Sequence, residues 1–144
     1  MFGPSFDRTR LDNITLGLDR KASRNLYKVP LAIRRLSASY RITARLGEQY
    51  DSVLMPTLAE VTPPIGHLDP MQDFDTVMER LVDWAAFTPL QNATGDPAIS
   101  LPLAQSSSGL PVGMMLSSTR GREARLLELA YELEDAHPWA RIQS

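Results

Sequence analysis

The sequence predicts an α/β fold in which helices pack on a few strands, and two observations carry this prediction. A long stretch with apolar residues at every third or fourth position, typical of an amphipathic helix, runs into a short and almost wholly apolar segment at residues 50–57. Nearer the C-terminus, two apolar segments joined by a polar loop with glycine predict a strand hairpin. At 144 residues, 43% of them hydrophobic, the chain is long enough to form a single domain or subdomain, 1–144.

The N-terminal third predicts one long helix after an irregular start. Residues 1–22 show no clean period, so we expect at most a short helical turn within a loop, and poor order there. From Ser23, a plausible N-cap, apolar residues recur at helical spacing to about Gln49, with arginines between them. Pro30 must kink this helix or start it afresh, because proline removes a backbone donor. Gly47 lies near the expected end.

The middle of the chain predicts one strand, one loop and one helix. The apolar segment that ends at Pro56 indicates a short strand buried on both faces. Residues 62–66 are rich in proline and predict an irregular loop. Helical spacing over residues 73–86 follows, with Asp69 and Pro70 placed as its cap and first-turn proline.

The C-terminal part predicts the hairpin and a last helix. Residues 88–97 are rich in turn-forming residues and lead into the expected strands 98–103 and 111–117. A Ser-Ser-Ser-Gly turn joins these strands. The last helix carries leucines at helical spacing, and Pro138 ends it. The order of the elements is therefore helix, strand, helix, strand, strand, helix.

The composition excludes several classes of protein. With no cysteine, the chain has no disulfide, no thiol nucleophile and no thiolate metal site. Its two histidines, His67 and His137, are too few for a zinc site built on several imidazoles. The net charge of −2 argues against a general nucleic-acid surface, and the apolar runs are too short for a membrane span. The first residues do not resemble a signal peptide, so we expect a cytoplasmic chain.

No local cluster of polar residues predicts catalysis better than it predicts structure. His67 has Asp69 two residues on, but neighbours in a loop rarely face each other as a catalytic pair. The serines of residues 106–109 have no histidine or lysine spaced to activate them, so a turn explains them better. The carboxylates of Asp69, Asp73 and Asp75 lack the spacing of a calcium loop and fit helix capping.

Several motifs, spaced in the same order, resemble the closing part of the amidase signature family. They are residues 87–103 (FTPLQNATGDPAISLPL), 109–116 (GLPVGMML) and 123–134 (EARLLELAYELE). Upstream, residues 50–59 (YDSVLMPTLA) resemble the strand that precedes this family's proline-rich loop. The resemblance runs from about residue 23 to Trp139, and it implies the C-terminal part of the family's mixed-sheet α/β fold.

The same resemblance shows which catalytic groups this chain lacks. The family uses a nucleophilic serine, a bridging serine in a Gly/Ser-rich signature and a lysine. No Gly-Gly-Ser-Ser-Gly-Gly-like stretch occurs in the 144 residues, and Lys21 and Lys28 match no catalytic position. We therefore expect no catalytic residue in this chain, and we expect the serine nucleophile outside it.

Two functions remain open at this point. The first is the C-terminal part of an amidase that hydrolyses carboxylic amide C–N bonds of a small-molecule substrate. In it, Pro56, Thr57, Asn92 and Thr94 would approach the acyl pocket, although ordinary turn chemistry also explains these residues. The alternative is a non-catalytic scaffold or binding module, either a truncated product or a docking subunit.

The expected partners follow from the sheet. A sheet separated from a larger neighbour leaves an unpaired edge and exposed apolar side chains. We expect this exposed strip at residues 53–55 and 114–116, and with it either a homodimer or an N-terminal amidase segment as the partner.

Overall fold

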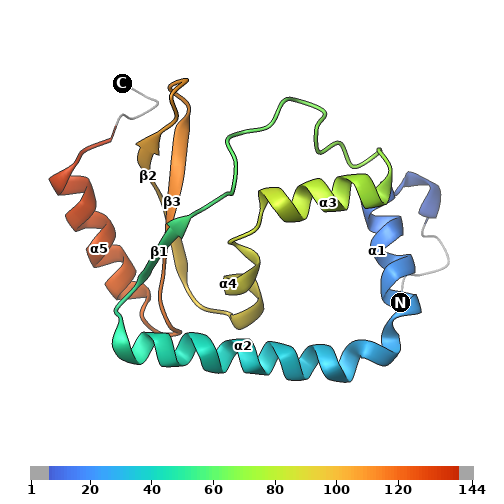
Figure 1. Cartoon of the computed structure of the whole chain (residues 1–144), viewed down its shortest axis with the longest axis horizontal. Helices are drawn as coiled ribbons and strands as arrows, with labels where there is room; N and C mark the ends of the chain where they lie inside the picture. The colour runs from blue at the N-terminus through green and yellow to red at the C-terminus, as the bar shows by residue number, and fades with distance from the viewer. Residues whose placement is uncertain (1–6, 140–144) are drawn as a thin grey trace.

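The computed structural model describes residues 7–139 (Figure 1). In this part of the chain, five α-helices and two short 3-10 turns accompany one three-stranded sheet, which confirms the α/β class. In chain order the elements are the 3-10 turn Arg8–Arg10, α1 Asn13–Arg24, the 3-10 turn Leu26–Lys28, α2 Val29–Gln49, β1 Val53–Pro56, α3 Phe74–Trp84, α4 Pro89–Thr94, β2 Ala98–Gln105, β3 Pro111–Ser117 and α5 Glu123–Ala136.

The sheet has the order β1-β3-β2, and both outer strands pair antiparallel with β3. The β2–β3 pair is the hairpin that the sequence predicts, and β2 continues to Gln105, beyond the expected end. Gly109 closes the turn with a φ of +81°, a conformation that glycine adopts without steric cost. The sheet among the described residues is therefore wholly antiparallel, and the expected mixed sheet stays a prediction.

The main core lies between the sheet and α5. Its buried side chains come from one position on each hairpin strand and two on α5: Leu101, Leu116, Leu126 and Ala130. Ile99, Leu103, Leu129, Leu133 and Trp139 pack partly buried around them. Leu126 and Ala130 are one helical turn apart, so a single face of α5 meets the hairpin. Figure 1 shows α5 lying along the β2 side of the sheet.

The N-terminal region is more helical than the sequence predicts. Helix α1 begins at Asn13, where a loop with one turn is expected, and the Asp12 side chain caps it by accepting from the Thr15 N–H at 2.7 Å. Ser23 lies in the last turn of α1, so the prediction that it starts the long helix is wrong. Pro30 lies in the first turn of α2 and starts a new helix, one of the two predicted alternatives. Poor order of residues 1–22 stays a prediction, and residues 1–6 lie outside the described part.

Helix α1 is held by α3, which lies far from it in the sequence. The Phe74 ring covers Gly17, where an added Cβ would come within 2.0 Å of the ring. The side-chain amide of Asn13 donates to the carbonyl oxygens of Met71 at 2.6 Å and Gln72 at 3.1 Å. Because these partners are almost 60 positions away, the local sequence pattern of α1 carries no trace of them.

Helix α3 is capped by Asp73, which confirms the predicted start of this helix and a capping role for this carboxylate. The placement of Asp69 and Pro70 as its cap and first-turn proline is wrong. One carboxylate oxygen of Asp73 accepts from the backbone N–H of Thr76 at 3.1 Å and from its hydroxyl at 3.0 Å. Asp69 instead accepts from the Met71 N–H within the preceding turn. The backbone and hydroxyl hydrogen bonds of Thr76 hold the pKa of Asp73 below its ordinary value of 3.8.

This cap predicts an acid-sensitive contribution to stability. Because the pKa of Asp73 is lower in the folded than in the unfolded chain, the cap stabilises fully above the unfolded pKa and is lost as the pH falls through the folded pKa. Asp73→Asn keeps an acceptor for Thr76 but removes the titration. We expect its urea midpoint to fall less than that of the unaltered chain between neutral pH and about pH 3.

The matched control is Asp83→Asn, which removes a carboxylate from an exposed position of the same helix. Circular dichroism at several pH values follows both variants. An equal loss of acid sensitivity in the two variants would show that general charge, and not the cap, causes the effect.

Residues 88–97 contain a short helix where the sequence predicts turns. Helix α4 begins with Pro89 and ends before Gly95, whose φ of +71° forms its left-handed C-cap. Gly47 also has a role that differs from the expected one. It lies inside α2, where an added Cβ would come within 2.2 Å of the Thr119 side chain. It therefore allows α2 to approach the segment that follows β3.

The expected exposed strip is only partly correct. Met115 and Leu116 of the central strand are 4% and 5% exposed, because β1 and β2 flank β3 and helices cover it. On the edge strand β1, by contrast, Leu54 is 55% exposed, so this strand is not buried on both faces. The larger apolar surface lies on α2, which has no buried residue.

Candidate functional site

The expected substrate-binding residues lie on two elements and line different surfaces. Pro56 ends β1 and Thr57 follows it, whereas Asn92 and Thr94 belong to α4. Pro56 and Thr57 border a hollow beside the hairpin that no α4 residue lines. The structure therefore does not bring the two pairs together within the described residues.

The hollow beside Thr57 has a volume of about 390 Å³. Its lining combines the end of β1 and the segment after it with the facing edge of the hairpin: residues 56–62, Ser100 and residues 111–113. Most of this surface is apolar, and the residues with polar side chains in its lining are Thr57, Glu60, Thr62 and Ser100. This is the composition expected of a site that binds a small organic molecule.

A pair of hydroxyl groups, from Thr57 and Ser100, belongs to residues that line this hollow. The Thr57 Oγ1 and Ser100 Oγ atoms lie 2.6 Å apart, and the Thr57 N–H donates to the carbonyl oxygen of Gly113 at 2.9 Å. An added Cβ at Gly113 would come within 2.9 Å of the Ser100 hydroxyl and 3.0 Å of the Thr57 hydroxyl. Glycine at this position therefore leaves room for the pair, and one proton of the pair remains free to donate to a ligand.

Thr94 is the most buried polar side chain of α4, at 1% exposure. Its hydroxyl lies 3.0 Å from the Leu90 carbonyl oxygen and 2.7 Å from a carboxylate oxygen of Asp96. Because a hydroxyl has one proton, the two acceptors share it. Neighbouring Asn92 is exposed. Substrate contact by either residue stays a prediction, and the Thr94 hydroxyl already has partners inside the chain.

The Arg120 side chain contacts two helices, α4 at Thr94 and α2 at Tyr40. Its guanidinium donates from Nε to the Thr94 carbonyl oxygen at 2.9 Å, and Nη2 donates to the same oxygen. The guanidinium also stacks over the Tyr40 ring of α2, 4.7 Å from the ring centre. The sequence does not reveal this role, because the acceptor is a backbone carbonyl and the ring lies 80 positions away.

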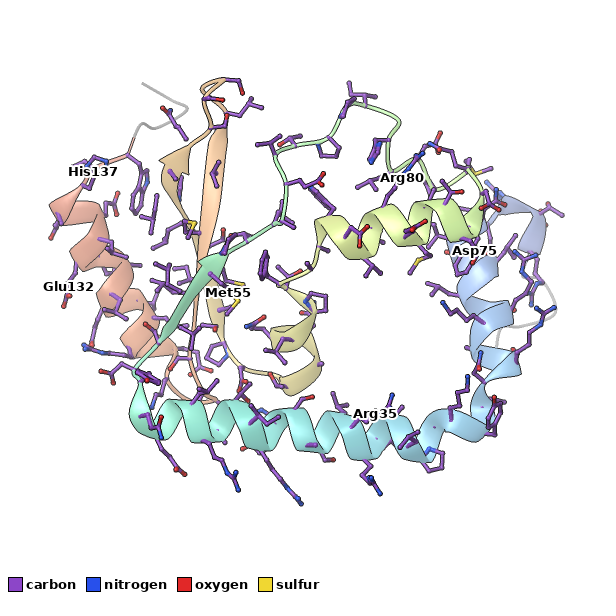
Figure 2. All side chains as sticks on the ribbon, viewed as in Figure 1. Arg35, Met55, Asp75, Arg80, Glu132 and His137 are labelled. Atoms are coloured by element: carbon purple, nitrogen blue, oxygen red, sulfur yellow. The ribbon has the colours of Figure 1, made fainter. Side chains whose placement is uncertain are left out.

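A second and smaller hollow separates α2 and α4 from the sheet. Met55, Leu90 and Gln91 are among the residues that line it, and Figure 2 shows Met55 on β1. Gln91 is 8% exposed, and its side-chain oxygen has no hydrogen-bond partner among the described residues. The hollow holds about 60 Å³, the volume of about two water molecules, so we assign no larger ligand to it.

The other polar candidates have structural roles. The Ser106 hydroxyl accepts from the Leu110 N–H at 3.0 Å and lies 2.9 Å from the Ser108 hydroxyl, which confirms a turn. The His67 carbonyl oxygen accepts from Arg80, which Figure 2 labels on α3, at 3.0 Å. No group of three or more carboxylates and histidines in residues 7–139 is placed to hold a metal ion. None of the helices there has the length and hydropathy of a membrane span.

Comparison with known proteins identifies the family. The Amidase family model matches residues 1–127. AmiC of Mycobacterium leprae, named as an amidase, is 61% identical over 142 residues, 99% of this chain and 30% of AmiC. AmiC of Mycobacterium tuberculosis H37Rv is 60% identical over 143 residues, with the same coverage. The 6-aminohexanoate-cyclic-dimer hydrolase of Paenarthrobacter ureafaciens is 38% identical over 96 residues, 62% of this chain and 20% of that enzyme.

The fold agrees with this relationship. The solved structure of 6-aminohexanoate cyclic dimer hydrolase complexed with substrate superposes with a TM-score of 0.80 at 28% identity. The superposition covers 95% of this chain and 30% of that enzyme. The chain therefore spans about 30% of the length of these relatives, and its strand hairpin and helices have the arrangement of an amidase C-terminal portion. The chain belongs to the amidase family and corresponds to a C-terminal portion of its longer relatives.

Proposed function

We propose that this chain is the C-terminal part of an amidase that hydrolyses carboxylic amide C–N bonds with a serine nucleophile outside these 144 residues. The observation that carries the proposal is the 61% identity with AmiC over 99% of the chain. The 144 residues contain no Gly/Ser-rich catalytic signature, so the chain contributes structure and pocket walls rather than the nucleophile. A cytoplasmic location stays part of this proposal.

The proposed reaction proceeds through an acyl-enzyme. The activated serine oxygen attacks the amide carbonyl carbon, and the tetrahedral intermediate carries its negative charge on the former carbonyl oxygen. The C–N bond breaks when the nitrogen takes a proton and leaves as the amine. Water then attacks the serine ester and releases the acid. None of these steps needs a metal or an organic cofactor, and none uses a base from this chain.

Pro56, Thr57, Asn92 and Thr94 are the residues that we propose for substrate contact, and Thr57 has the strongest support. It lines a hollow of about 390 Å³, and its hydroxyl pairs with that of Ser100, another lining residue. A hydroxyl pair in a mostly apolar wall fits the polar group of an otherwise apolar acyl chain. Thr94 has the weakest support, because its hydroxyl is buried among acceptors of its own chain.

A chimera tests the proposed function. In it, this chain replaces the matching C-terminal portion of Mycobacterium tuberculosis AmiC, to which it is 60% identical. We expect the chimera to hydrolyse a simple aryl amide and to lose this activity when the AmiC nucleophile is changed to alanine. A folded chimera without activity, beside active AmiC, would instead support the non-catalytic scaffold.

Thr57→Val tests the pocket within the same chimera. Valine keeps the shape of threonine but removes the hydroxyl, so we expect kcat/KM to fall about tenfold through a higher KM. The control is Thr43→Val, since the Thr43 hydroxyl donates to the Tyr40 carbonyl oxygen of its own helix. Unchanged kinetics in the Thr57 variant, or an equal loss in both variants, would remove Thr57 from the proposed site.

A further inference from the structure

The longest helix among the described residues, α2, contacts other elements mainly along its C-terminal half. Helix α2 has 21 residues and no buried side chain, although its sequence is amphipathic. A helix in a folded protein gains most of its stability by packing its apolar face, so a helix of this length with none of its residues buried indicates an unpartnered surface. Figure 1 shows its first half running apart from α3 and from the sheet.

The C-terminal half of the apolar stripe already has partners. Tyr40 lies under the Arg120 guanidinium, and Thr43 lines the small hollow against α4 and the sheet. One turn further along the same stripe, Gly47 lies against Thr119. Positions 40, 43 and 47 follow one another at helical spacing, so one face of α2 makes these contacts.

The N-terminal half of the same stripe is exposed. Val29, Ile33 and Leu36 precede Tyr40 at spacings of three and four residues, so they lie on the face that packs further along. Their exposed fractions are 45%, 59% and 44%. We refer to Val29, Ile33 and Leu36 as the docking stripe.

We propose that the docking stripe binds the part of an amidase that this chain does not span, the segment that contains the catalytic serine. This inference rests on the proposed function. The occupant follows from two findings: this chain spans 30% of AmiC, and it keeps a TM-score of 0.80 with a hydrolase of which it covers 30%. The stripe thus lies on a fold that, in the longer relative, is one part of a larger enzyme.

A second copy of the chain explains the surface less well. Pairing two copies through the stripe would cover the apolar side chains, but it would not account for a fold that 95% of this chain shares with a longer relative. Self-association in the absence of the catalytic segment is the expected behaviour of an uncovered apolar face. The proposal therefore predicts that the catalytic segment displaces any copy-to-copy contact made by the stripe.

Binding to a separately produced catalytic segment is the first test. A fluorescent label on this chain reports the Kd for the non-matching portion of Mycobacterium tuberculosis AmiC by anisotropy. We expect Ile33→Asp with Leu36→Asp to weaken binding at least about tenfold, because a carboxylate in a closed apolar interface has no partner. The control is Leu31→Asp with Ile42→Asp, which removes exposed apolar side chains, 45% and 62% exposed, from the opposite face of α2.

The binding test has two outcomes that overturn the proposal. One is equal weakening by the stripe variant and by the control. The other is self-association through the stripe that excess catalytic segment leaves unchanged, which would assign the surface to a second copy.

Hydrogen exchange on the chimera provides a second measurement if the AmiC segment does not fold alone. We expect amides of residues 29–40 to exchange at least about tenfold more slowly in the chimera than in this chain by itself. The Ile33→Asp and Leu36→Asp variant should lose this protection and the control should keep it. Equal exchange in chimera and chain would overturn the proposal. An inactive chimera that shows the protection would refute the proposed function and leave the docking surface in place.

Discussion

The purified 144-residue chain is expected to hydrolyse no amide above the rate of buffer alone. Its serine-rich turn supplies no activated nucleophile, because the Ser106 hydroxyl bonds to the Leu110 N–H and to Ser108. A serine without an adjacent base is a weak nucleophile. Since enzymes accelerate reactions by about a million-fold or more, the chimera should exceed the chain by a factor of that order.

Release of the amine from an aryl amide measures the hydrolytic activity of the chain and of the chimera in the same assay. Ser107→Ala is the informative variant of the chain alone, because Ser107 is the exposed middle serine of the turn. If the chain hydrolysed the amide and Ser107→Ala abolished the activity, a nucleophile would lie within these 144 residues. The proposal that the nucleophile lies outside them would then be wrong. Equal activity of the chain and of its Ser107→Ala variant would indicate a contaminating hydrolase.

The elements that the sequence predicts well are those with a clear local pattern. The hairpin has two apolar segments around a turn that closes at Gly109, and α5 has a leucine stripe that ends before Pro138. Helix α1 has a local cap in Asp12, but the Phe74 ring on Gly17 and the Asn13 bonds to a distant loop have no local signal. Sequence periodicity does not report contacts of that range.

Two predictions failed where a usable signal was present. Pro89 in the first turn and Gly95 just past the end are a standard pair of helix limits, and they enclose α4. Asp73 lies three residues before Thr76, the spacing of an N-cap, and Asp69 does not have that place relative to α3. The predicted start of α3 at residue 73 is confirmed, so only the choice of Asp69 as its cap is wrong, whereas neither limit of α4 was predicted.

The candidate site is likewise only partly predictable from the sequence. The Pro-Thr step after β1 is visible in the sequence, and the resemblance to amidases points to it. Its hydroxyl partner, Ser100, is 43 positions away on another strand, and Gly113 shapes the pair from a third. Only the strand register brings these three residues together. A single sequence therefore indicates where the hollow begins, but not what completes it.

Leu126→Ala is expected to have the largest effect on stability of any conservative change in the chain. Leu126 is 3% exposed and belongs, with Leu101 and Leu116, to a core cluster of four buried side chains. Truncating a buried leucine to alanine costs about 2–5 kcal/mol through lost burial and the remaining cavity. In a chain with so small a core, a loss of this size leaves little net stability.

Leu127→Ala is the matched control, because it makes the same change at the next position of α5, where the side chain is 52% exposed. Helix propensity changes equally in the two variants, so the difference between their urea midpoints reports burial. We expect Leu127→Ala to change the free energy of unfolding by less than about 0.5 kcal/mol. Equal destabilisation by the two variants would mean that α5 does not pack on the hairpin through Leu126 and Ala130. The same comparison in the chimera should give the same order of effects, since this core lies within the chain and not at the docking stripe.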